Sequence, residues 1–223
     1  MVSTMALVDT LDEQALLEQV LDESKPAVPE DCRNLHYLLF TPFRYGAYYP
    51  HGSRFRRAGV TPGVFYAAVE TATAVAEMAF WRLIFHAESP ATPWPTNAGE
   101  YTAFAVRYST GKGLDLTRAP LSADAEIWTH PIDYPPCQAL ADSARLVGVQ
   151  VLRYQSARAA GLNVAVLACK AFARPEPLEQ QRWRIHVGAN GARAICAYPD
   201  QRLAFDRAAF ARDPRIASMK WDR

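Results

Sequence analysis

The segment GVFYAAVETATAVAE, residues 63–77, decides the fold of this chain. After the turn residues TPG at 61–63, the apolar run at 64–67 is typical of a short buried strand. From residue 70 to about residue 85 the pattern predicts a helix, and Glu70 suits the positive end of its dipole. The segment therefore predicts a strand that leads directly into a helix, a building unit of α/β proteins.

The chain beyond this unit is predicted to be rich in strands. Pro135 and Pro136 suit the first turn of a helix over residues 135–147, and Gly148 suits its end. The tripeptide ANG at 189–191 is a strong hairpin signal. We therefore expect a single α/β (α+β) domain with a mixed, largely antiparallel sheet and flanking helices. The further strands are expected at residues 100–108, 114–116, 149–154, 163–172, 181–187 and 193–198.

Residues 1–30 are predicted to be an N-terminal helix and linker, and residues 31–223 the main domain. Thr10 and Glu13 form a capping box at the start of the helix. Pro26 and Pro29 end this unit. The helix could dock on a partner or on the domain itself, and both alternatives stay open. Its apolar stripe consists of Leu16, Leu17, Val20 and Leu21.

Charge and composition exclude some classes of protein. The 223 residues suffice for one sizeable domain, and half of them are apolar. The formal net charge is only +1, from 24 basic and 23 acidic residues. Because this balance gives no general attraction to a polyanion, we expect no DNA binding by this chain.

Neither a secretory leader nor a membrane span is recognisable. The start, MVSTMALVDT, has no basic segment followed by an apolar run. The longest apolar candidate, residues 72–85, is interrupted by Glu77 and Arg82. We therefore expect a cytoplasmic protein whose cysteines are reduced thiols without a C-x-x-C pair. They are Cys32, Cys137, Cys169 and Cys196.

Glu77 is the most informative candidate for chemistry. An unpaired carboxylate is costly in an apolar stripe, and buried acids are often simply paired. Taken alone, Glu77 is therefore better interpreted as the partner of a nearby arginine. The alternative is that Glu77 lines a cleft and faces a ligand hydroxyl or a developing positive charge. Its neighbours at helical spacing are Thr73, Ala74, Phe80 and Trp81.

The segment from residue 44 to residue 57 mixes arginines, aromatic residues and glycines. Arginine binds phosphate through two parallel hydrogen bonds, and aromatic faces stack on planar rings. Glycines let the backbone approach a ligand closely. A solvated basic loop explains the segment equally well. The residues concerned are Arg44, Arg54, Arg56, Arg57, Tyr45, Tyr48, Tyr49, Phe55, Gly46, Gly52 and Gly59.

Tyr66 and Ser156 complete the set of candidates. Tyr66 lies in the predicted strand, where a core tyrosine with a satisfied hydroxyl is the simpler interpretation. Ser156 follows a strand and precedes turn residues, as capping serines often do, and no G-x-S-x-G surrounds it. No histidine pairs with Cys137 by spacing, and no metal-ligand motif is present, so we expect a core cysteine and no metal.

Three segments together resemble the RES family, named for its Arg, Glu and Ser. They are FRYGAYYPHGSRF at 43–55 around Arg54, GVFYAAVETATAVAE ending at Glu77, and CQALADSARLVGVQVLRYQSARAAGLNVAVL at 137–167 with Ser156 and Asn163. They occur in the order of the family, and the resemblance covers roughly residues 35–172. The chain departs from the family at 52–56, where GSRFR replaces a common GGRWN.

The resemblance implies a fold similar to ADP-ribosyltransferase toxins and NAD+ as the substrate, without a metal. It also implies a toxin of a type II toxin–antitoxin pair, whose partner is an Xre/ParS-like antitoxin that blocks the cleft. The expected activity is transfer of ADP-ribose to a cytoplasmic protein, which arrests growth. The alternative is an NAD+ glycohydrolase or phosphorylase that depletes NAD+.

The resemblance also gives each candidate a role. Arg54 would bind the phosphates or the nearby ribose, and Tyr66 would stack on nicotinamide. Glu77 would hydrogen-bond a ribose hydroxyl and stabilise the cation that forms there. Ser156 would position a phosphate or support Glu77. Arg44 and Tyr45 would help to line the cleft.

Two alternatives from other classes remain at this point. The basic and aromatic segment at 44–57 also fits a non-catalytic nucleotide- or RNA-binding module. The near-neutral charge and the segments around Glu77 and Ser156 argue against that module. An interaction protein that has lost its activity is the third interpretation, and the joint presence of the four candidates argues against loss.

Overall fold

The computed structural model describes residues 7–45 and 52–222 and contains two four-stranded sheets. In the first sheet the order is β1 (Phe65–Ala68), β5 (Leu162–Val166), β4 (Val151–Gln155) and β3 (Gly113–Asp115). In the second sheet it is β2 (Gly99–Phe104), β6 (Gln180–Gly188), β7 (Gly191–Cys196) and β8 (Gln201–Phe205). Only the β3–β4 pair is parallel. The expected α+β domain with mixed, largely antiparallel sheets is therefore confirmed.

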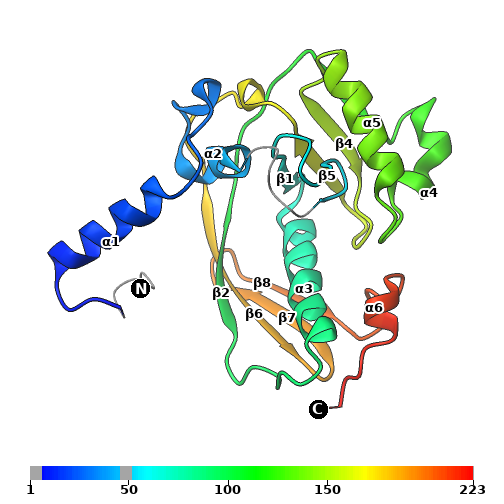
Figure 1. Ribbon diagram of the computed structural model, residues 1–223. Coiled ribbons are helices and arrows are strands. Elements are labelled where there is room, and N and C mark those ends of the chain that lie inside the picture. The colour runs from blue at the N-terminus through cyan, green and yellow to red at the C-terminus, as the bar shows by residue number, and fades with distance from the viewer. Residues whose placement is uncertain (1–6, 46–51, 223) are drawn as a thin grey trace.

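Helix α3 (Thr71–Glu88) connects the two sheets. It starts three residues after β1 and runs down to the second sheet, where it packs on β6 and β7 (Figure 1). Phe80, Leu83 and Ile84 of α3 are buried there against Trp183 and Ile185. The strand–helix unit predicted at 64–85 is thus present, with the helix ending three residues later than expected.

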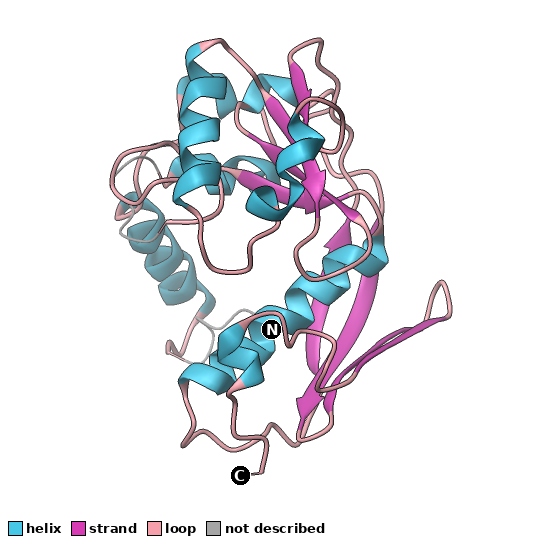
Figure 2. Ribbon diagram, turned by 90° about the vertical axis from the view of Figure 1, so that its right-hand side faces the viewer, coloured by secondary structure: helices cyan, strands magenta, loops and turns pink. Residues whose placement is uncertain are grey.

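Helices cover both faces of the first sheet. On one face α5 (Pro135–Leu146) buries Ala141 against Leu152 and Ala165. On the other face α2 (Tyr37–Arg44) buries Phe43 among Val151, Val164 and Val166. This double coverage explains why β5 is buried almost continuously rather than at alternate residues. In the part of the chain that the structure describes, helices pack on only one side of the second sheet (Figure 2).

Several predicted bounds need correction. The strand expected at 163–172 ends at Val166, and a 3-10 helix, Cys169–Ala171, follows. The hairpin at ANG is confirmed, since β6 and β7 pair up to Gly188 and Gly191. Helix α2, which contains Pro42, and strand β8 were not predicted. The remaining short elements are α4 (Ala125–Trp128), α6 (Pro214–Ala217) and the 3-10 helices Glu30–Cys32 and Leu121–Asp124.

The N-terminal helix α1 (Leu11–Glu23) has the predicted capping box of Thr10 and Glu13. It points away from the domain and buries none of its residues (Figure 1). Leu16, for example, is 60% exposed. Arg44 holds the C-terminal end of α1 through an ion pair with Asp22 at 2.8 Å. The apolar stripe of α1 is therefore not docked on the described part of the domain, which contacts the C-terminal end of the helix through Arg44.

The expectation of four reduced cysteines is wrong for two of them. Cys32 and Cys169 form a disulfide, although they are 137 positions apart in sequence. Cys137 and Cys196 are free and buried, as a core position requires. The spacing could not predict this pair, because only the folded chain brings the two 3-10 helices together. Among the described residues, no helix combines the length and apolar character that a membrane crossing requires.

Candidate active site

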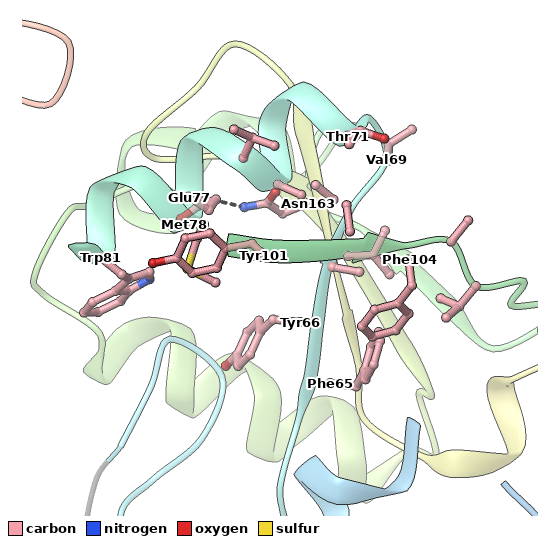
Figure 3. Close-up of a pocket in the computed structure, with 18 of the residues that line it drawn as sticks. Phe65, Tyr66, Val69, Thr71, Glu77, Met78, Trp81, Tyr101, Phe104 and Asn163 are labelled. Carbon is pink, nitrogen blue, oxygen red and sulfur yellow. Dashed lines mark hydrogen bonds between the residues drawn. The ribbon is translucent and has the colours of Figure 1, made fainter. Parts of the chain in front are cut away.

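A cavity of about 720 Å³ lies where the edge strand of one sheet faces the edge strand of the other. Its walls are formed by β1 and the residue after it (65–69), by β2 and the two residues after it (101–106), and by one face of α3. Figure 3 shows Trp81, Tyr101 and Tyr66 around one end, and Phe65 and Phe104 at the other. A cavity of this size, mostly apolar with a few converging polar groups, is typical of a small-molecule site.

Glu77 provides the only carboxylate of α3 that lines this cavity among the described residues. The side chain of Glu77 is 19% exposed, so it reaches the cavity without being fully solvated. Its Oε1 accepts hydrogen bonds from Ser156 Oγ and Asn163 Nδ2, both at 2.7 Å (Figure 3 draws the second). Two short bonds to one oxygen fix the carboxylate in one orientation.

The hydroxyl of Ser156 donates its proton to Glu77. Residue 156 directly follows β4 and is buried. The Oγ atom accepts the backbone N–H groups of Arg158 and Ala159, each at 3.1 Å. A hydroxyl has one proton and two lone pairs, so its proton is left for Glu77. The serine is therefore both a turn residue, as its sequence context indicated, and a support for the carboxylate.

Asn163 reaches the same carboxylate from β5. It is buried, and in the sheet it stands between Ala68 of β1 and Tyr154 of β4. The sequence placed Asn163 in a motif but gave it no role. Burial raises the pKa of the Tyr154 hydroxyl beside it, so this hydroxyl stays neutral at ordinary pH.

Arg158 lines the cavity and was not among the residues predicted from the sequence. Its Nη1 lies 3.4 Å from Glu77 Oε2, and Nη2 lies 3.1 Å from the hydroxyl of Tyr134. The guanidinium also stacks on the rings of Phe80 and Trp81, at 4.2 and 5.3 Å from their centroids. Glu77 is therefore paired with an arginine, as one interpretation of the sequence predicted, and it also lines a cavity, as the alternative predicted. No local pattern marks Arg158, since its partner is 81 residues away.

Arg54 lines the cavity, but its two terminal nitrogens already have partners. Nη1 donates to the carbonyl of Trp128 at 2.7 Å and Nη2 to that of His130 at 2.9 Å. The guanidinium also lies over the ring of Tyr134, 4.9 Å from its centroid. Arg54 therefore ties its own loop to the segment before α5. Burial raises the pKa of the Cys137 thiol beneath it, although the positive charge of Arg54 opposes that rise.

Tyr66 presents its ring to the cavity while its hydroxyl is held. The residue is 39% exposed. Its hydroxyl is 2.8 Å from Ser53 Oγ and accepts the backbone N–H of Phe55 at 3.0 Å. Burial of this hydroxyl raises its pKa, so the phenol stays protonated. The ring is consequently a fixed, neutral surface on which a planar group can stack.

The remaining predicted residues lie elsewhere. Arg44 does not line the cavity, because it faces α1 and donates to Asp22 and to the carbonyl of Pro26. Tyr45 lines a second cavity, of about 540 Å³, which shares Ser53 and Tyr66 with the first. The candidates Gly46, Tyr48 and Tyr49 lie outside the described residues.

The arginines that follow Arg54 have partners within the domain. Arg56 donates to the carbonyl of Tyr45 at 2.7 Å, and Arg57 pairs with Asp142. One group of potential metal ligands occurs among the described residues, formed by Asp31, Cys32 and Cys169. Because the two sulfurs are bonded to each other, they are not thiolate ligands.

The cavity thus combines an oriented carboxylate, the guanidinium groups of Arg54 and Arg158, and an aromatic surface. Comparison with known proteins relates the chain to one family: residues 28–187 match the model of the RES domain. The match includes every residue described above as lining the cavity. Among curated proteins, no sequence matches the chain significantly.

Proposed function

We propose that this chain, which belongs to the RES domain family, uses NAD+ as its substrate and cleaves the bond between nicotinamide and ribose. Membership of a family associated with NAD+ and with toxin–antitoxin pairs supports the proposal. The observation that carries it is the carboxylate of Glu77, which faces the cavity and is fixed by Ser156 and Asn163.

Cleavage of this bond needs a negative group beside the ribose. As nicotinamide leaves, positive charge develops on the ribose ring, as it does in glycoside hydrolysis. A carboxylate that is already oriented stabilises this charge without reorganisation during the reaction. Glu77 takes this role and hydrogen-bonds a ribose hydroxyl, while Ser156 and Asn163 hold it in place.

Tyr66 and Arg54 take the supporting roles. The ring of Tyr66 stacks on nicotinamide and keeps it twisted from the ribose, because the fixed hydroxyl prevents the ring from turning away. Arg54 holds the loop that carries Ser53 and adds positive charge near the ribose and its phosphate. Tyr45 lines the neighbouring cavity, to which Tyr66 also contributes, and has an accessory role.

In this proposal the acceptor of ADP-ribose is a cytoplasmic protein, and the modification arrests growth until an Xre/ParS-like antitoxin neutralises the toxin. The exposed helix α1 supports a protein acceptor, because it offers a surface for a target outside the domain. Water and phosphate are the alternative acceptors, and either would make the protein a consumer of the NAD+ pool.

The test is to incubate the purified chain with NAD+ labelled on the adenylate phosphate, in bacterial lysate and in buffer with and without phosphate. Label on one protein band supports protein modification, and label on free ADP-ribose or its phosphorylated form supports NAD+ depletion. Intact NAD+ with a folded protein refutes the enzyme and favours a nucleotide- or RNA-binding module.

Glu77→Gln is the variant that connects this activity to the cavity. It should lower turnover roughly 10²–10³-fold, the usual effect of losing one electrostatic stabiliser. Glu70→Gln is the matched control, since Glu70 precedes the same helix, lies outside the cavity and should leave turnover unchanged. Equal turnover of the two folded variants would contradict the role of Glu77.

A further inference from the structure

Glu77 and Arg158 neutralise each other in the free protein. Their side chains are 19% and 9% exposed, and their charged atoms are 3.4 Å apart. A carboxylate that must stabilise a cation is weakened by a neighbouring guanidinium, because the two positive charges compete for it. The pair therefore has to separate, at least in part, before Glu77 can act on a ligand.

The three partners of Glu77 are divided between its two oxygens. Ser156 and Asn163, both neutral, bind Oε1. Arg158, the cation, lies against Oε2. If Arg158 moves away, Oε1 keeps both hydrogen bonds and the carboxylate keeps its position. Oε2 then becomes free to accept a hydroxyl of the ligand.

Arg158 has an unused donor that points to a ligand. Its Nε is buried and has no hydrogen-bond partner among the described residues. Arginine prefers to bind phosphate with two parallel N–H groups, which Nε and a terminal nitrogen provide together. The terminal nitrogens of Arg54 donate to backbone carbonyls, whereas those of Arg158 donate to Glu77, to the hydroxyl of Tyr134 and to the carbonyl of Pro131. Of these two cavity arginines, Arg158 is the one paired with a side-chain carboxylate, whose place an anionic ligand can take.

We propose that Arg158 is the diphosphate-binding residue of the cavity and that it masks Glu77 until a diphosphate takes its place. This proposal rests on the proposed function only in taking NAD+ as the molecule that carries the diphosphate. A diphosphate competes with Glu77 for the guanidinium, and its arrival releases the carboxylate toward the ribose of the same molecule. Phe80 and Trp81 stack on the guanidinium and limit its movement to the cavity side.

The first experiment measures binding of inorganic pyrophosphate by calorimetry at constant ionic strength. Arg158→Gln should weaken binding about tenfold or more, and Arg158→Lys should recover part of the loss. Arg82→Gln is the matched control, since Arg82 lies on α3 outside the cavity and should leave the affinity unchanged. Equal affinities of the wild type and a folded Arg158→Gln protein overturn the proposal.

The second experiment tests the masking. Because Glu77 competes for Arg158, Glu77→Gln should bind pyrophosphate more tightly than the wild type, by about tenfold. Glu179 also lines the cavity, but it forms no ion pair with Arg158. Glu179→Gln should therefore tighten binding about twofold or less. Equal effects of the two substitutions overturn the masking, because they would reflect only the loss of one negative charge.

These outcomes are separable from the fate of the proposed function. If NAD+ stays intact but pyrophosphate binds as described, the proposed reaction fails and the assignment of Arg158 holds. If NAD+ is cleaved and Arg158→Gln leaves KM and pyrophosphate affinity unchanged, the reaction holds and the assignment of Arg158 fails. With both correct, Arg158→Gln raises the KM for NAD+ at least as strongly as it lowers kcat.

Discussion

Replacing Ser156 by alanine tests whether this residue serves the carboxylate or only its own turn. The substitution removes the 2.7 Å hydrogen bond to Glu77 and leaves the N–H groups of Arg158 and Ala159 without an acceptor. A hydrogen bond to a charged group contributes about 2 kcal/mol, and we add about 1 kcal/mol for the turn. Ser156→Ala should therefore lower the free energy of unfolding by about 3 kcal/mol.

The assay is urea unfolding of four proteins: the wild type, Ser156→Ala, Glu77→Ala and the double variant. This cycle isolates the interaction of the two side chains from the effect of each substitution on its own surroundings. The expected coupling energy is about 1.5–3 kcal/mol. Because Asn163 still holds the carboxylate in Ser156→Ala, turnover should fall about tenfold rather than vanish.

A coupling energy below about 0.5 kcal/mol would refute this reasoning, since that is the error expected for independent sites. Ser156 would then be a turn residue whose contact with Glu77 contributes nothing to stability. An equal loss of turnover in Asn163→Ala and Ser156→Ala supports a shared task, because both residues donate to the same oxygen.

Three further predictions concern stability. Burial raises the pKa of Tyr66 and Tyr154, so these two hydroxyls should lose their protons at a lower pH in the unfolded chain than in the folded protein. The free energy of unfolding should therefore fall as pH rises above about 10. Urea titrations between about pH 9 and 11 check this, and a double phenylalanine variant should show a flatter profile. Deleting residues 1–25 should change the melting temperature by less than about 2 °C, because α1 buries no residue, and a larger drop in calorimetry would reveal a packing role. Cys32→Ser removes a disulfide that closes a long loop and should cost about 2–4 kcal/mol in urea unfolding without reductant, whereas an unchanged midpoint would show that the bond does not form.

The sequence predicted most reliably what depends on near neighbours. The strand and helix at 64–85, the capping box at Thr10 and the hairpin at 189–191 are each encoded within a few residues. The prediction missed α2, which contains a proline, and it placed the end of β5 too late, because the chain turns into a 3-10 helix there. In both places tertiary packing overrides the local preference.

The candidate site was predictable only in part for the same reason. Glu77, Tyr66 and Arg54 stand out by residue type and motif, and all three line the cavity. Arg158 does not stand out, since its importance comes from Glu77, 81 residues earlier in the chain. Arg44 did stand out, but the fold turns it toward α1. Residue type indicates what a side chain can bind, whereas the fold decides which partner it meets.

The short connection between β1 and α3 has a consequence for how such a site can diversify. Tyr66 and Glu77 are separated by only 11 positions on one continuous strand–helix unit, so their spacing is almost built into the chain. The opposite wall, β2, belongs to the other sheet and is joined to this unit by packing rather than by a short connection. Substitutions in β2 can therefore reshape the cavity while the half that carries Tyr66 and Glu77 stays unchanged. Ancestral changes of specificity should accordingly accumulate on the β2 side.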